Sequence, residues 1–311
     1  MSNRPFSTSL RARNSVGYPM KHGPLRTRCC QGLIAVCSPS SRQRSGERLR
    51  CTVCSKPSDM LTFAEEQRVA VQFGVAVEQV RRDHLISHLL GAISRDFAQD
   101  VLFFGGTALS RTVLPDGRLS EDIDLIALGP RQQIAERMER LLLQAIRREF
   151  PALQWLPALT EVRDTQPAVI TTSAGATVRV QLLNRTGYPA WPTERQQIVQ
   201  RYSDAPAAEL IVPTTPAFVA WKTAAWADRK ASRDLYDLKL LADQGAVTED
   251  AAELFRRFGP TNRYPSGALF TDPPNEATWQ RELSAQTRLT VTAAEALRNV
   301  RESWASIVRM A

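Results

Sequence analysis

Residues 101–128, VLFFGGTALSRTVLPDGRLSEDIDLIAL, decide the fold of this chain. Residues 101–104 are a short apolar run that predicts a strand, and Gly105 and Gly106 follow it as a turn without Cβ atoms to obstruct the approach of a phosphate. Thr107 then opens a short helix whose first N–H groups are available to an anion. The stretch therefore predicts a strand, a turn and a helix that together suit a phosphate group.

Two carboxylates follow on the next predicted strand. Residues 121–125, EDIDL, alternate polar and apolar side chains, which is the pattern of a half-buried strand. Because strand side chains alternate between faces, Asp122 and Asp124 lie on one face. Neighbouring carboxylates repel each other unless a cation binds them, and Mg²⁺ or Mn²⁺ held by carboxylates and substrate phosphates is the usual solution. We therefore predict that Asp122 and Asp124 hold a metal.

These two features are informative together rather than singly, since a lone DxD or a lone Gly-Gly usually marks only a turn or loop. The sequence has neither GxxxxGK[ST] nor GxGxxG, which excludes a P-loop and a Rossmann dinucleotide site. The combination resembles the minimal signature of the DNA-polymerase-beta-like nucleotidyltransferase superfamily, in which a glycine turn holds the triphosphate and a DxD pair holds the metal. More narrowly, FGGTALSR followed by RLSEDIDL is similar to the AbiEii and MenT toxins of type IV toxin–antitoxin systems.

A second block extends the resemblance. Residues 216–246, PAFVAWKTAAWADRKASRDLYDLKLLADQGA, begin with a proline suited to the first turn of a helix and resemble the K…R…RDxxDL block of that group. The resemblance implies that Lys222 contacts the triphosphate and that Asp234 lies near the reaction centre, with Asp237 as its close rival. Taken alone, the block is typical of a solvated pair of amphipathic helices with i,i+4 ion pairs.

One position departs from the superfamily, many members of which carry a third metal-binding or base carboxylate on a later strand. The candidate strand is 177–184, TVRVQLLN, whose alternation puts Arg179 and Gln181 on one face. Gln181 can neither take up a proton nor bind a metal with a full charge. We expect Asp234 to supply this function; the alternative is an enzyme with one metal or with lower activity.

The resemblance implies a reaction and its partners. An NTP lies over Gly105 and Gly106, with its phosphates on the N–H groups of the turn that leads into Thr107 and on Ser110 or Arg111 if the short helix presents them. An acceptor hydroxyl attacks the α-phosphorus, and pyrophosphate leaves. The implied acceptor is a tRNA 3′ end, which can then no longer be aminoacylated, so the protein is expected to be a toxin that inhibits translation and has a cognate antitoxin.

Basic residues give weaker support to an RNA acceptor. Arg229, Lys230 and Arg233 cluster within the second block, and Arg256, Arg257 and Arg263 surround a long Gly/Pro-rich loop at 256–274. Together they suit an RNA backbone, and Trp191 or Tyr264 suits stacking on a terminal base. A run of charges is more often a solvated face.

Two other classes of function remain open. One is a nucleotidyltransferase that modifies a small molecule or a protein hydroxyl and needs no basic stripe. The other is a non-catalytic protein that binds an NTP or a partner. Ser120, two residues before Asp122, is a candidate for control, because a phosphate there adds negative charge beside the two carboxylates; a plain strand-edge serine is the simpler interpretation.

The predicted fold class is α/β (α+β), a small mixed sheet with a C-terminal helical domain. Residues 60–205 form the nucleotidyltransferase domain and 206–311 the helical domain, with the cleft between them. Predicted strands are 101–104, 121–125, 155–163, 168–172 and 177–184. Predicted helices are 62–73, 77–97, 132–150, those of Lys222 and Asp234, 248–258, and 278–310 with a break near Gln286. No apolar run reaches 18 residues, so we expect a cytoplasmic protein without a membrane span.

Residues 1–59 differ from the rest of the chain in composition and charge. The chain has 311 residues and a net charge of +8, but residues 1–58 hold 11 of its 40 Lys and Arg and one of its 32 acids, which leaves 29 basic and 31 acidic residues beyond them. We interpret 1–59 as a disordered basic leader or a misassigned extension, with the start near Met60. It holds all five cysteines, and the CxxC of Cys51 and Cys54 lacks a second half for zinc.

The spacing of two histidines also permits a metal. His84 and His88 stand at i,i+4 on a predicted helix, as the two histidines of HExxH do. Because no acid lies between them, we interpret the pair as an ordinary helix face.

Overall fold

A computed structural model describes residues 61–173 and 175–308 of the chain. The predicted leader, its cysteines and the proposed start at Met60 therefore lie outside the described residues. All described residues belong to one compact unit.

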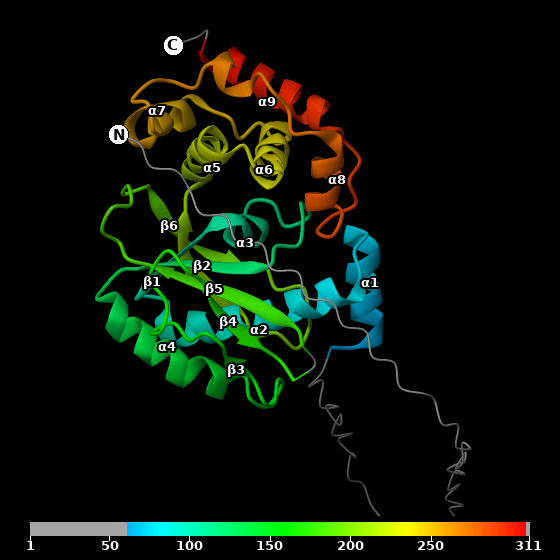
Figure 1. The fold of residues 1–311 in the computed structure, drawn as a ribbon, viewed down its shortest axis with the longest axis vertical. Helices are drawn as coiled ribbons and strands as arrows, with labels where there is room; N and C mark the ends of the chain where they lie inside the picture. Colours follow the sequence, from blue (N-terminus) through cyan, green and yellow to red (C-terminus); the bar gives the residue numbers. More distant parts are fainter. Residues whose placement is uncertain (1–60, 174, 309–311) are drawn as a thin grey trace, which may run out of the picture. The chain divides into compact units, whose positions relative to one another are not determined.

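A mixed sheet of seven strands forms the centre of this unit (Figure 1). Its strands are β1 (Val101–Phe104), β2 (Asp122–Ala127), β3 (Gln154–Trp155), β4 (Ala168–Thr171), β5 (Thr177–Leu183), β6 (Thr193–Ile198) and β7 (Ala208–Pro213). The spatial order is β3-β4-β5-β2-β1-β7-β6. β2 pairs with β1 in antiparallel and with β5 in parallel orientation. The strands that were predicted to carry chemistry thus lie side by side in the middle of the sheet.

Helices cover the sheet and extend beyond it. Four of them, α1 (Phe63–Phe73), α2 (Val77–Phe97), α3 (Gly105–Ser110) and α4 (Arg131–Ala145), come before β3 in the chain. After β7 follow α5 (Thr215–Arg229), α6 (Ser232–Asp243), α7 (Glu249–Phe258), η1 (Gly267–Phe270), α8 (Glu276–Leu283) and α9 (Ala293–Val308). Figure 1 shows α2 and α4 along one side of the sheet, and α5 to α9 gathered beyond α3. None of the described helices has the length and apolarity needed to cross a membrane.

The main core lies between the sheet and its covering helices. Leu89 and Ile93 of α2 and Met138 of α4 are fully buried together with Val180 and Leu182 of β5. Each such side chain contributes roughly 1.5–3 kcal/mol by leaving water. The core continues into the C-terminal helices, where its largest members are Trp226, Trp279 and Trp304. The sheet and these helices therefore share one apolar interior, which fixes the site that both contribute to.

The prediction of an α/β fold with C-terminal helices is confirmed, with three local differences. The predicted strand 155–163 is reduced to Gln154–Trp155 and is followed by turns. Strand β6 was not predicted. Strand β7 lies beyond the predicted domain boundary at residue 205, yet it pairs with β1 inside the sheet through Leu102 and Ile211. The sheet therefore ends at Pro213, and α5 begins directly after it.

Candidate active site

The glycine pair lies at the end of β1, directly against the carboxylate strand. The β1–β2 register places Phe104 opposite Asp124, so that the next residue, Gly105, lies beside the Asp124 side chain. Gly105 has φ +77°, and a Cβ atom there would come within 2.1 Å of Asp124 Oδ2. A Cβ atom on Gly106 would come within 2.7 Å of an Arg118 Nη atom. Helix α3 begins at Gly105 itself, two residues earlier than predicted, and both glycines are required by close packing.

Asp122 and Asp124 differ in their surroundings although they share a face of β2. Asp122 accepts two hydrogen bonds from Arg179 of β5, from Nε at 2.7 Å and from Nη2 at 3.0 Å. Asp124 is half-buried, and no Arg or Lys of the described residues forms an ion pair with it. Burial, followed by repulsion from Asp122, raises the pKa of Asp124 to about 6. The charges of Lys222, Arg229 and Arg179 act in the opposite direction but do not outweigh burial and Asp122.

A buried network of charges faces this strand from α5 and α6. Lys222 Nζ lies 3.1 Å from Asp234 Oδ1 and 2.7 Å from Asp237 Oδ2. Asp234 also accepts from Arg229 Nε at 2.7 Å, and Asp237 accepts from Arg118 Nε at 2.8 Å. Burial alone would raise the pKa of both acids, but their cationic partners outweigh it and lower both. Both acids of RDLYDL are therefore held ionised, each between two cations.

Several of these groups meet in a cleft of about 770 Å³, although Asp122 and Arg118 do not line it. Its lining includes Phe104, Gly105, Gly106, Asp124, Gln181, Tyr188, Trp191, Trp221, Lys222, Arg229, Asp234 and Phe258. Asp237 is also absent from this lining, although its Oδ2 lies 2.7 Å from Lys222 Nζ. The two sequence blocks, about a hundred residues apart, thus contribute to one site. Within RDLYDL it is Asp234 that reaches the cleft.

Aromatic rings form one wall of the cleft, a feature that sequence reasoning found only in part. Trp221 stacks on Phe104 at 4.7 Å between ring centroids and on Trp191 at 5.6 Å. Trp191 in turn contacts Phe258 at 5.2 Å. Trp191 had been singled out, and the available signal for Trp221 was its place directly before Lys222. The other predicted stacking residue, Tyr264, is 39% exposed and donates to Glu253, so it does not belong to this wall.

Three side chains at the short helix α3, which were predicted to contact phosphate groups, form hydrogen bonds within the protein. The Thr107 hydroxyl donates to the Asp122 carbonyl oxygen, and the Ser110 hydroxyl donates to the Thr107 carbonyl oxygen at 3.1 Å. Arg111 is fully buried and donates to Asp83 Oδ1 of α2 at 2.8 Å. Ser110 and Arg111 are therefore buried in the protein and do not line the cleft. Their hydrogen bonds stabilise the position of α3 instead.

Ser120 and Gln181 lie close to the carboxylates, as their sequence positions predict. Ser120 is 8% exposed, and its Oγ would lie 3.2 Å from a Cβ atom on Gly106. Gln181 lines the cleft opposite Asp124 in the β2–β5 register. Arg118, the first residue of the RLSEDIDL motif, was assigned no function from the sequence; its guanidinium group lies behind the glycine turn.

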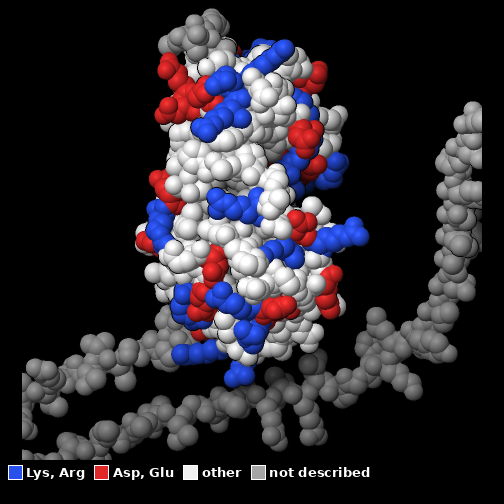
Figure 2. All heavy atoms as spheres, turned by 90° about the vertical axis from the view of Figure 1, so that its left-hand side faces the viewer, with Lys and Arg blue, Asp and Glu red and all other residues white. Residues whose placement is uncertain are grey.

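The six basic residues of the suggested RNA stripe do not form one free surface. Arg229 pairs with Asp234, Lys230 Nζ donates to the Leu269 carbonyl oxygen at 2.5 Å, and Arg256 pairs with Glu253. Arg263 is exposed. Figure 2 shows basic and acidic side chains intermingled on one face, with uncharged areas between them.

Comparisons with known proteins agree with this geometry. The family model described as nucleotidyl transferase AbiEii toxin, type IV TA system, matches residues 88–310. Among solved structures, MenT4, the nucleotidyltransferase toxin Rv2826c from Mycobacterium tuberculosis H37Rv, has a TM-score of 0.59 at 21% identity, covering 79% of this chain and 89% of that one. JHP933 from Helicobacter pylori has a TM-score of 0.48 at 13% identity, covering 76% and 94%. No curated protein matches the sequence.

Proposed function

The chain belongs to the AbiEii family of nucleotidyltransferase toxins of type IV toxin–antitoxin systems, and on that premise we propose that it transfers a nucleotide from an NTP to a tRNA 3′ end with Mg²⁺ or Mn²⁺. One observation carries the proposal. Gly105, Gly106 and Asp124 of the first block line the same cleft as Lys222 and Asp234 of the second. A glycine turn, an uncompensated carboxylate and a cation in one cleft suit a triphosphate and its metal.

The chemistry of Asp122 and Asp124 fits a divalent metal. Both offer the oxygen ligands that Mg²⁺ prefers, and burial together with the charge of Asp122 raises the pKa of Asp124, which a bound cation would lower again. A metal at the pair would neutralise phosphate charge and lower the pKa of an attacking hydroxyl, so that no histidine base is required. Before Asp122 can bind a metal, its ion pair with Arg179 has to break. The Arg179 side chain is 49% exposed, so it can turn towards solvent.

Lys222 is the residue that we assign to the triphosphate. Its ammonium group is a compact point charge held in the cleft wall by Asp234 and Asp237. The two acids fix its position before the substrate arrives, so little reorganisation remains for the reaction step. Gly106 allows the backbone of the turn to approach the phosphates from the other side.

The aromatic wall is suited to the base of the NTP or to the last base of the acceptor. Stacking on an aromatic ring contributes roughly 1–3 kcal/mol per base and accepts any base. Trp221 is itself stacked with Phe104 and Trp191, so a base would contact the part of this wall that these contacts leave open to the cleft. The tRNA backbone would then contact the exposed cations near the cleft, among which Arg263 and the half-exposed Arg229 are candidates.

The direct test incubates the purified chain with total tRNA, Mg²⁺ and each labelled NTP in turn. Label on the tRNA 3′ end, accompanied by pyrophosphate release, is the expected result. It should disappear on chelation of the metal and in Asp124→Ala and Lys222→Ala, but persist in the matched surface variant Lys239→Ala. Label at internal positions, or activity that is unaffected in both site variants, would contradict the proposal.

The same assay separates the two rival functions. A transferase for a small molecule or a protein hydroxyl would label its own acceptor and leave tRNA unlabelled, with weak salt dependence of acceptor binding. A non-catalytic NTP-binding protein would bind the nucleotide without releasing pyrophosphate. The cognate antitoxin expected for this family would act by covering the cleft or by modifying Ser120; either route should block labelling.

A further inference from the structure

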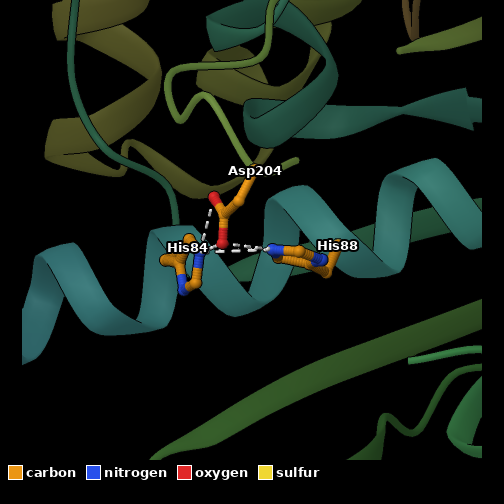
Figure 3. A group of neighbouring side chains, drawn as sticks. All are labelled: His84, His88 and Asp204. Carbon is orange, nitrogen blue, oxygen red and sulfur yellow. Dashed lines mark hydrogen bonds and ion pairs between the residues drawn. The ribbon is translucent and has the colours of Figure 1, made fainter. Parts of the chain in front are cut away.

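Three side chains of the types that bind metal ions meet beside α2, outside the cleft. His84 and His88 stand one turn apart on α2, and Asp204 reaches them from the segment between β6 and β7 (Figure 3). His84 Nε2 lies 2.9 Å from Asp204 Oδ2, and His88 Nε2 lies 3.2 Å from the same oxygen. The two Nε2 atoms are 3.2 Å apart. The ordinary helix face that the spacing suggested is thus completed by a carboxylate from a distant part of the chain.

Hydrogen bonds alone do not satisfy this triangle of atoms. An ionised carboxylate oxygen only accepts, so both Nε2 atoms must carry a proton to bond to it. The two N–H groups then face each other across 3.2 Å. If one ring instead accepts from the other, its lone pair faces the carboxylate oxygen. In either arrangement of the protons, two N–H donors or two lone pairs face each other along one edge of the triangle. This repulsion disappears if all three atoms direct a lone pair at one cation.

The dimensions of the triangle agree with those around a metal ion. Tetrahedral zinc holds nitrogen and oxygen ligands at roughly 2.0–2.2 Å, which separates neighbouring ligand atoms by about 3.3–3.5 Å. The three edges here measure 2.9, 3.2 and 3.2 Å, so an increase of a few tenths of an ångström is sufficient. Two histidines at i,i+4 with one carboxylate also form an established zinc ligand set.

We propose that His84, His88 and Asp204 bind Zn²⁺ as a site separate from the catalytic cleft. The three side chains are only 7%, 2% and 4% exposed, so the ion is held within the protein. His84 and Asp204 also line a cavity of about 450 Å³ that gives the ion a route in and supplies water for the fourth position. Leu85 stands where HExxH carries its general base, which points to a structural ion and not to a hydrolytic one.

The position of the site indicates what the ion stabilises. Asp204 belongs to the segment that also carries Tyr202, whose hydroxyl donates to Asp83 of α2 at 3.0 Å. Asp83 in turn accepts from Arg111, the residue that follows α3. Zinc would fasten the segment after β6 to α2, next to the contacts that hold α3 and its glycines. The ion would therefore raise the stability of the unit without contacting the substrate.

The test measures zinc binding in the full-length protein after stripping with a strong chelator. Cys51→Ser and Cys54→Ser are introduced first, so that the CxxC cannot contribute, and zinc is titrated in competition with a chromophoric chelator. We expect one tight site per chain and a higher melting temperature with zinc. Asp204→Asn and His88→Gln should each weaken binding by at least about 100-fold, since even the loss of an outer-shell partner weakens metal sites by about 10–100-fold.

Matched variants identify where the ion binds. His22→Gln removes the third histidine of the chain, and Asp122→Asn alters the cleft; both should leave zinc affinity and the thermal shift unchanged. Unchanged zinc binding in folded Asp204→Asn, loss of it in Asp122→Asn, or no tight binding by the parent protein would each overturn the proposal. If the site variants fail to fold, Co²⁺ substitution in the parent decides: intense visible bands of a four-coordinate ion support the site, and an octahedral spectrum overturns it.

Discussion

Replacing Asp124 with asparagine should stabilise the protein at neutral pH while abolishing nucleotide transfer. Burial and the neighbouring Asp122 raise the pKa of Asp124 from 3.8 to about 6. A carboxyl whose pKa is raised on folding binds its proton more tightly in the folded state, so the folded state loses stability as the group ionises. This destabilisation is absent below about pH 4, develops between about pH 4 and pH 6, and is constant above that range.

The size of the effect follows from the shift. At about 1.4 kcal/mol per pKa unit, a change from 3.8 to about 6 corresponds to roughly 3 kcal/mol above pH 6. Partial exposure of the side chain screens some of this, so we expect Asp124→Asn to gain about 1–3 kcal/mol at about pH 8 and roughly half as much at about pH 5. Urea denaturation of both proteins at the two pH values, without metal, measures the difference. Added Mg²⁺ should then stabilise the parent protein but not the variant.

Asp237→Asn is the matched comparison, because it should lower the free energy of unfolding, which Asp124→Asn should raise. Arg118 and Lys222 outweigh the burial of Asp237 and hold its pKa at about 2. Its stabilisation is fully present above about pH 4 and is lost as the pH falls towards about 2, and breaking the buried pairs should destabilise by about 3–5 kcal/mol at neutral pH. An Asp124→Asn protein that is less stable than its parent at pH 8, or a difference independent of pH, would refute the reasoning.

Three further changes test other parts of the site. Arg179→Ala frees Asp122 from its ion pair and should lower the Mg²⁺ concentration for half-maximal activity by up to about fivefold, since exposed pairs contribute at most about 1 kcal/mol; a higher Mg²⁺ requirement would mean that Arg179 serves the substrate. Lys222→Met should raise the KM for the NTP and destabilise by about 3–5 kcal/mol, because two buried acids lose their shared cation, whereas unchanged kinetics would remove Lys222 from the site. Ser120→Glu should lose labelling and growth inhibition while Ser120→Ala keeps both, and an active Ser120→Glu would exclude phosphate control there.

The centre of the fold was predictable because its sequence signals are local. Alternation identified β2 and β5, and the glycine pair marked the end of β1. Strand β6, TERQQI, carries no alternation, and most of its side chains are exposed. Its conformation depends on pairing with β7, which is a tertiary contact. The predicted strand 155–163 is short because its backbone stays paired with Val169 of β4 only as far as Pro157, after which the chain forms turns.

The residues of the site likewise fall into those that a local motif identifies and those that only the fold brings there. Asp122, Asp124, Lys222 and Asp234 were found from motifs, whereas the partners that set their charge were not. Arg118 reaches Asp237 across 119 residues, and Asp204 reaches His84 across 120. A contact between residues so far apart in the chain leaves no spacing pattern from which the sequence alone could predict it. Motifs therefore point to candidate reacting groups, whereas the fold sets the electrostatic environment of these groups.

That environment bears on the missing third carboxylate. Gln181 stands opposite Asp124 in register and lines the cleft, which is where a carboxylate on β5 would contribute, and its amide is neutral. Asp234 was expected to take over this function, but both of its oxygens are bonded to Lys222 and Arg229, and its pKa is lowered. A carboxylate with a lowered pKa is a weak base, and two cations compete with any metal for its oxygens. We infer that Asp234 positions Lys222 and Arg229, and that a metal held by Asp122 and Asp124 would supply the activation of the attacking hydroxyl.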